Sequence, residues 1–172
     1  MVDLSRRNFM RAKKVSSPPA IRLPWTADEA LFTRGCTQCG DCISACEENI
    51  IIKGDGGFPE INFSAGECSF CQACVKSCKE PLFNSLDTLP WQLDIEIQSS
   101  CLAKKQIHCQ ICQDSCEPEA IVFKYLHGSV PQPEITLEDC TSCGACGAVC
   151  PESAINLSVS RQSTSYLGAN NE

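Results

Sequence analysis

The sequence predicts an α+β fold of two tandem βαββαβ modules, on the strength of three observations. Sixteen cysteines fall into four groups of four, spread over 172 residues. Each pair of groups encloses two short apolar segments on either side of a glycine-containing turn, a pattern that indicates a β-hairpin. Aromatic residues make up only 6% of the chain, too few for a large apolar core, so disulfides, metals or cofactors must help to hold such small modules together.

The chain begins with a basic segment, residues 1–25, which we expect to be a disordered tail. It carries six basic side chains and one acidic one, whereas the whole chain has a net charge of −7. A segment whose charge opposes that of the body is either a solvated leader or a docking tail for a partner, and both readings stay open. The acidic body argues against binding to nucleic acid.

Ser5-Arg6-Arg7 resembles a twin-arginine export motif, but the residues after it are not those of an export signal. Such a signal continues with an apolar stretch, whereas this chain continues with Ala12-Lys13-Lys14 and then Pro18-Pro19. No run of apolar residues approaches the roughly 18 that a membrane span needs. We therefore expect a cytoplasmic protein without a membrane span.

The first module is predicted over residues 26–88. Its hairpin consists of Ile50-Ile51-Ile52 and residues 58–63, on either side of the turn Gly54-Asp55-Gly56-Gly57. Leu82-Phe83-Asn84 is the expected closing strand. The polar, proline-containing residues Asp87-Thr88-Leu89-Pro90 are the natural linker to the second module.

The second module is predicted over residues 91–160 and repeats this order. Residues 93–97 alternate apolar and acidic side chains and are the expected opening strand. Residues 120–123 and 131–137 then flank Gly128 as a second hairpin. Residues 161–172 are expected to form a flexible C-terminal tail.

The cysteines carry the chemistry. Their four groups are Cys36, Cys39, Cys42 and Cys46; Cys68, Cys71, Cys74 and Cys78; Cys101, Cys109, Cys112 and Cys116; and Cys140, Cys143, Cys146 and Cys150. Three groups have the spacing C-x2-C-x2-C-x3-C, which is that of bacterial ferredoxins, and the third has five extra residues in its first gap. The spacing therefore predicts two bacterial ferredoxin-like modules with four [4Fe–4S] clusters and all sixteen cysteines as ligands.

In two-cluster ferredoxins the fourth cysteine of a group binds the other cluster. Here that scheme predicts four ligand sets: Cys36, Cys39, Cys42 and Cys78; Cys68, Cys71, Cys74 and Cys46; Cys101, Cys109, Cys112 and Cys150; and Cys140, Cys143, Cys146 and Cys116. Pairing of the first group with the fourth, and of the second with the third, stays open. Zinc sites and disulfides are alternatives, but zinc sites use paired C-x2-C units and disulfides belong to oxidising compartments.

The widened third group raises the question of whether Cys101 reaches its cluster. His108, beside Cys109, is the alternative ligand; otherwise His108 and His127 are read as polar surface. Trp25 and Trp91 stand near the two module starts, and are interpreted as packing residues rather than electron-transfer residues. No catalytic motif occurs elsewhere, so we do not expect an enzyme.

The chain resembles the NapF family, the ferredoxin-type proteins of periplasmic nitrate reductase systems. The resemblance rests on Ser5-Arg6-Arg7, on Arg22-Leu23-Pro24-Trp25, on Glu67-Cys68-Ser69-Phe70-Cys71, and most specifically on Cys101-Leu102-Ala103 with the long gap before residues 109–118. It implies a cytoplasmic four-cluster protein that interacts with the precursor of the nitrate reductase catalytic subunit, NapA. Such a protein would assist NapA maturation before export, by delivering electrons or a cluster. The alternatives are a low-potential electron-transfer ferredoxin and an electron-transfer subunit of a molybdenum oxidoreductase.

Overall fold

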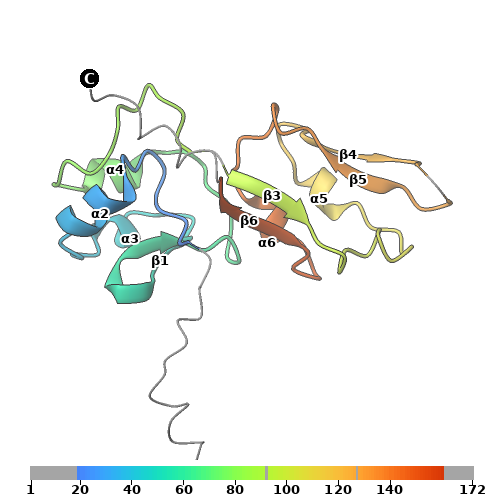
Figure 1. Ribbon diagram of the computed structural model, residues 1–172, viewed down its shortest axis with the longest axis horizontal. Helices are drawn as coiled ribbons and strands as arrows, with labels where there is room; N and C mark the ends of the chain where they lie inside the picture. Colours follow the sequence, from blue (N-terminus) through green and yellow to red (C-terminus); the bar gives the residue numbers. More distant parts are fainter. Residues whose placement is uncertain (1–18, 92, 127, 161–172) are drawn as a thin grey trace, which may run out of the picture.

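The computed structural model describes residues 19–91, 93–126 and 128–160. Most of the predicted N-terminal tail, the Ser5-Arg6-Arg7 motif, His127 and the predicted C-terminal tail lie outside these residues. We refer to residues 19–90 as the N-terminal half and to residues 91–160 as the C-terminal half. The two halves lie side by side (Figure 1).

Short helices and short strands make up both halves, which confirms the α+β class. The N-terminal half contains α2 (Glu29–Gly35), α3 (Asp41–Ser44), β1 (Ile51–Lys53), the 3-10 helix η1 (Asp55–Gly57), β2 (Pro59–Ile61) and α4 (Ala73–Ser77). The C-terminal half contains β3 (Leu93–Ile97), α5 (Ile111–Asp114), β4 (Ile121–Lys124), β5 (Gln132–Ile135), α6 (Ala145–Ala148) and β6 (Ile155–Val159). No helix among the described residues is long and apolar enough to span a membrane.

Both predicted hairpins are present. β1 pairs antiparallel with β2, with Ile51 opposite Ile61, and β4 pairs antiparallel with β5, with Ile121 opposite Ile135. In the first hairpin, Gly56 and Gly57 have φ values of 63° and 83°, a left-handed conformation that glycine adopts without steric cost. The short apolar segments thus form the strands of the hairpins, and the glycines form the turn of the first one, as the sequence predicts.

The outer strands differ between the halves. In the C-terminal half, β3 spans the predicted residues and pairs along its whole length with β6, from Leu93 opposite Val159 to Ile97 opposite Ile155. In the N-terminal half, the predicted closing strand is reduced to an isolated bridge between Phe83 and Thr26. Trp25, next to the bridge, has φ of 62°, outside the β region, so a regular strand does not extend through it.

The packed part of the N-terminal half begins before residue 26, where the tail was expected to end. Leu23 and Trp25 are 2% and 5% exposed, and the Ile61 N–H donates a 2.8 Å hydrogen bond to the Ile21 carbonyl. The Arg22 guanidinium also binds the Glu29 carboxylate at 2.7 Å, in the first turn of α2. These residues hold the start of the described chain against β2 and α2.

The cores of both halves are small and contain cysteines. Phe32 and Ile50, both 1% exposed, are central to the N-terminal core, against which Cys36, Cys42 and Cys46 pack. The buried residues of the second cluster are Cys112, Ile121, Cys146 and Ile155. Two of these four residues are cysteines, so thiol side chains make up a large part of the C-terminal core.

Candidate metal centres

Left-handed backbone residues shape three of the cysteine loops. In the first, second and fourth groups, the residues immediately before and after the second cysteine all have positive φ: Gln38 and Gly40, Phe70 and Gln72, Ser142 and Gly144. For a residue with a side chain this conformation costs roughly 1–2 kcal/mol, and such strain concentrates at functional sites. The turns curl each loop so that its first three thiols face one space.

The third cysteine of each group lies in a short helix and the fourth follows that helix. Cys42, Cys74, Cys112 and Cys146 lie in α3, α4, α5 and α6, respectively. The backbone N–H groups of Cys46, Cys78, Cys116 and Cys150 each donate to a carbonyl three residues earlier. About one helical turn therefore separates the third and fourth cysteines, which displaces the fourth by ~6 Å along the helix from the third.

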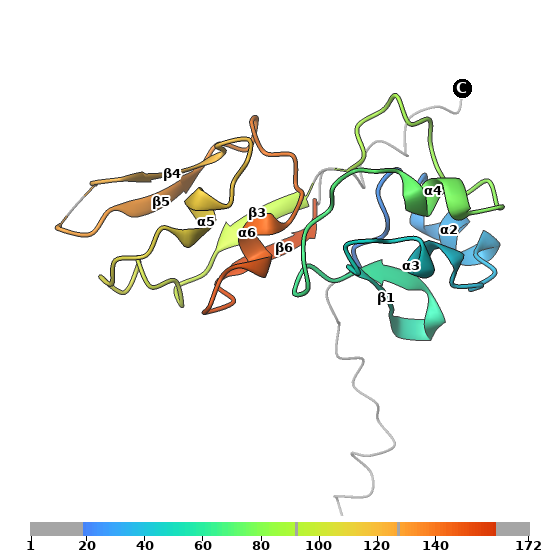
Figure 2. The ribbon, with the colours of Figure 1, turned by 180° about the vertical axis from the view of Figure 1, so that it is seen from behind.

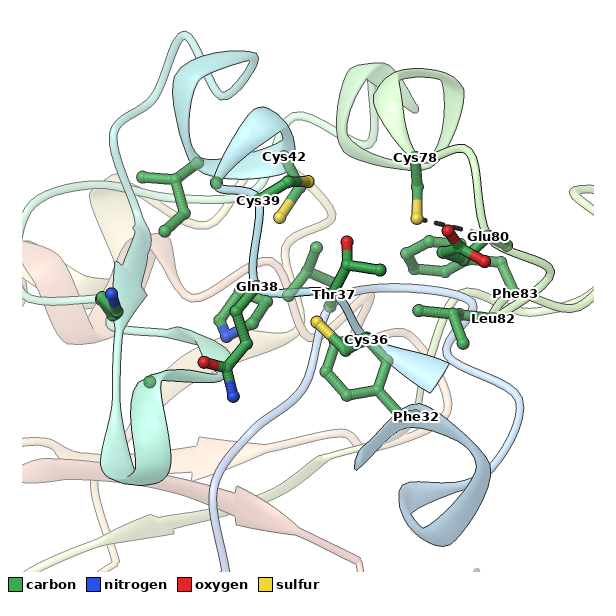
Figure 3. Close-up of a pocket in the computed structure, with 16 residues that line it drawn as sticks. Phe32, Cys36, Thr37, Gln38, Cys39, Cys42, Cys78, Glu80, Leu82 and Phe83 are labelled. Carbon is green, nitrogen blue, oxygen red and sulfur yellow. Dashed lines mark hydrogen bonds between the residues drawn. The ribbon is translucent and has the colours of Figure 1, made fainter. Parts of the chain in front are cut away.

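Around a cavity of about 150 Å³ in the N-terminal half lie Cys36, Cys39, Cys42 and Cys78, the first quartet. Figure 3 shows the first three on one loop and Cys78 entering from the end of α4. The Cys78 thiol also approaches the Glu80 carbonyl at 3.7 Å. Apolar side chains, Phe32 and Leu82 among them, complete the wall. The space exceeds the roughly 10–15 Å³ that a cavity needs to hold one water.

In the C-terminal half, a tighter cavity of about 20 Å³ is lined by Cys101, Cys109, Cys112 and Cys150, the third quartet. Cys101 therefore lies with the other three despite the widened gap. The extra residues form a compact turn in which Ala103 is fully buried and the Gln132 side-chain amide donates to its carbonyl. His108 is exposed and does not line this cavity.

The remaining eight cysteines form two further sets. The second quartet is Cys46, Cys68, Cys71 and Cys74, and the fourth is Cys116, Cys140, Cys143 and Cys146. Burial, with the nearby thiols of the same quartet, raises the pKa of Cys74 to about 12, and likewise that of Cys146 to about 12. Each buried thiol thus keeps its proton at neutral pH until a metal replaces it, because burial penalises the thiolate.

The four quartets are those that exchange of the fourth cysteine predicts: first group with second, third group with fourth. Pairing of the first group with the fourth does not occur, since Cys78 and Cys46 exchange within the N-terminal half. All sixteen cysteines are free thiols. Among the described residues, no three His, Cys, Asp or Glu side chains gather closely enough to hold a single metal ion.

The donor chemistry of the quartets fits an iron–sulfur cluster. Four soft thiolates around one space can each bind a different iron of a cube. Backbone N–H groups already point at cysteine sulfurs: Ser142 donates to Cys140 at 3.4 Å, and Ala154 to Cys150 at 3.3 Å. Such N–H···S bonds stabilise bound thiolates and tune the reduction potential of a cluster.

Comparison with known protein families agrees with this geometry. Residues 35–82 and residues 107–154 each match a family model described as a 4Fe-4S dicluster domain. The first match contains all four cysteines of the first cavity, and the second contains Cys109, Cys112 and Cys150 but not Cys101. Together they define the class: an iron–sulfur protein of two tandem 4Fe-4S dicluster domains.

Curated relatives give the particular family. The chain is 45% identical to the ferredoxin-type protein NapF of Escherichia coli K12, over 90% of this chain and 94% of that protein. It is 43% identical to the NapF protein of Haemophilus influenzae, over 93% of this chain and 97% of that protein. The ferredoxin-type protein NapG of E. coli K12 is more distant, at 24% identity over 76% of this chain. The chain belongs to the NapF family of ferredoxin-type proteins.

Sequence reasoning missed one structural role. Trp91 was expected only to pack its preceding segment onto a module. In addition, its indole N–H donates to the Ser142 carbonyl at 3.2 Å, and its ring meets the Phe63 ring edge-on with 5.9 Å between the centroids. It therefore connects the N-terminal half to a cysteine loop of the C-terminal half. Nothing local to Trp91 indicates this. Trp25 does pack as expected: it is buried, and its indole N–H donates to the Thr88 carbonyl at 3.0 Å.

Exposure of the thiols predicts the order in which metal is lost. Cys39 and Cys71, in the first and second quartets, are exposed, whereas all eight cysteines of the C-terminal half are at least partly buried. An anaerobic iron chelator should therefore strip the N-terminal half first. Alkylation followed by peptide mass spectrometry should label cysteines 36–78 before cysteines 101–150. Urea-unfolded protein is the control and should label all of them together; the reverse order in folded protein would contradict the prediction.

Proposed function

We propose that this chain is a cytoplasmic protein that carries four [4Fe–4S] clusters and assists maturation of the periplasmic nitrate reductase catalytic subunit, NapA, before export. One cluster would be held by each quartet, with all sixteen cysteines as ligands. The quartets would lie in two fold units over residues 26–88 and 91–160, the first of which also includes the packed residues 21–25 that precede it. The observation that carries the proposal is the convergence of the cysteines into four quartets in a chain that is 45% identical to NapF over nearly its whole length. No enzymatic activity of its own is proposed.

The bound clusters would supply one-electron redox chemistry. The residues around the clusters would set their reduction potential. The apolar wall of the first quartet and the buried thiols of the second and fourth keep water away. Exclusion of water lowers the reduction potential of a negatively charged cluster. Exposed Cys39 and Cys71 bring two quartets to the protein surface, where a partner could exchange electrons or receive a cluster. Both modes of assistance to NapA are compatible with this exposure.

The partner would be NapA in its cytoplasmic precursor form. The similarity to relatives named NapF and NapG supports this choice of partner, because the resemblance to the NapF family implies a role in periplasmic nitrate reductase systems. The sequence before residue 19 is basic and the remainder of the chain is acidic, and complementary charge between partners favours specific docking. Because Leu23 and Trp25 belong to the packed fold, we place the docking tail at residues 1–18.

A capture experiment tests this proposal. Cluster-loaded protein is used as anaerobic bait for the NapA precursor and for mature NapA. We expect specific capture of the precursor from the cytoplasmic fraction, with weaker capture after deletion of residues 1–18 and unchanged iron content. Deletion of residues 162–172 is the matched control and should leave capture unaffected. Failure to capture either form, with the full iron content on the bait, would contradict the proposal.

The second candidate function is a low-potential electron-transfer ferredoxin or an electron-transfer subunit of a molybdenum oxidoreductase. The compact dicluster repeat favours it, because electron transfer is the general role of such domains. A free carrier would reduce several unrelated acceptors without binding any in fixed ratio, whereas a subunit would co-purify in fixed ratio with one enzyme. The same bait distinguishes both from a transient maturation factor.

A further inference from the structure

The cysteine loops of the second and fourth groups touch each other across the two halves. The Cys68 backbone N–H donates a 2.8 Å hydrogen bond to the Cys143 carbonyl. The first of these residues belongs to the second quartet and the other to the fourth.

Close packing surrounds this contact. A Cβ atom added at Gly144 would lie 2.0 Å from the Phe63 ring, so this loop position and Phe63 are in direct contact. The Leu93 N–H donates to the Ser142 hydroxyl at 3.3 Å, and Ser142 is 4% exposed. We call the set of Phe63, Cys68, Trp91, Ser142, Cys143 and Gly144 the junction. Hydrogen bonds and close side-chain packing thus hold the two halves together at the junction.

Within each half, the two quartets lie close together because their cysteines share a short helix or a buried core. Cys42 of the first quartet and Cys46 of the second are separated by one helical turn. In the C-terminal half, Cys112 of the third quartet and Cys146 of the fourth belong to the same buried core cluster. In both views α6, with a fourth-quartet cysteine, lies nearer the N-terminal half than α5, with a third-quartet cysteine (Figure 2).

We propose that the four quartets form a single electron path in the order first, second, fourth, third, and that the junction is its connection between the halves. The proposal rests on the electron-transfer role given above. Each step moves one electron from a reduced cluster to its oxidised neighbour, so one is oxidised and the next reduced, with no bond broken and no proton moved. A low-potential one-electron donor supplies the electron at one end, and a one-electron acceptor on the partner removes it at the other.

Two full-length double variants test this order. Cys39→Ser with Cys109→Ser removes one ligand each from the first and third quartets and leaves the inner pair; Cys71→Ser with Cys143→Ser leaves the outer pair. Each should retain about eight iron atoms per chain, two cubes of four. After full reduction with dithionite, we expect the electron paramagnetic resonance spectrum of the inner-pair variant to be split by spin–spin coupling. The outer-pair variant should give the simple sum of two isolated clusters.

An unsplit spectrum from the inner-pair variant, with eight iron atoms present, would overturn the proposal. If that variant loses its iron, hydrogen exchange at the Cys68 amide of the intact four-cluster protein decides: protection supports the junction, and exchange at the rate of a freely exposed amide overturns it. Neither readout involves NapA. Uncoupled clusters with intact capture would therefore reject the path alone, and coupled clusters without capture would reject only the maturation role.

Discussion

Replacing Cys101 by serine is expected to lower the iron content from about sixteen to about twelve atoms per chain, the loss of one cube. Cys101 lines the same cavity as Cys109, Cys112 and Cys150, so we expect it to be the fourth ligand of the third quartet. A serine hydroxyl is a poor substitute because iron–sulfur clusters select thiolates. Iron analysis and the visible absorbance per chain measure the effect.

His108→Ala is the matched control for this prediction. His108 is exposed and lies outside the cavity, one residue before Cys109, so its removal should leave all four clusters in place. If Cys101→Ser keeps the full iron content while His108→Ala loses one cluster, the histidine and not Cys101 is the ligand. The two variants together thus decide the question that the widened gap raises.

Replacing Gly144 by alanine is expected to destabilise the protein by about 2–5 kcal/mol. Part of this cost, roughly 1–2 kcal/mol, comes from placing a side chain at φ of 89°. The rest comes from the overlap of the new methyl group with the Phe63 ring, 2.0 Å away, which must shift in a packed site. The denaturant midpoint for loss of cluster absorbance under anaerobic conditions measures it.

Gly40→Ala separates the two contributions. Gly40 occupies the same place in the first group, has φ of 85°, and has open space where a Cβ would stand. Gln72 has a side chain at the equivalent place in the second group, so a Cβ there is compatible with the loop. Gly40→Ala should therefore show the backbone cost alone. In a Phe63→Ala background the cost of Gly144→Ala should fall to that of Gly40→Ala; equal costs of both substitutions in the wild-type background would mean that Phe63 does not constrain Gly144.

The sequence by itself was sufficient for the class of site and for the local elements. Cysteines two residues apart can share a cluster whatever surrounds them, so the spacing of the groups is informative without any tertiary contact. The hairpins at Ile51 and Ile121 follow equally from short-range pattern and turn glycines. These features depend on residues close together in the chain, whose interactions sequence patterns record well.

Only the tertiary structure decided which distant residues meet. Cys101 reaches the third quartet because the turn around Ala103 is anchored by Gln132, far along the chain. Trp25 ends the outer strand of the N-terminal half after one bridge, through a left-handed backbone conformation that no propensity indicates. The junction joins the loops of Cys68 and Cys143, which are 75 residues apart in the sequence, and Trp91 and Phe63 pack beside this contact. Besides the two cysteines, its members are a glycine, a serine and two aromatic residues. They meet through shape and packing between the two halves, which a local sequence pattern does not record.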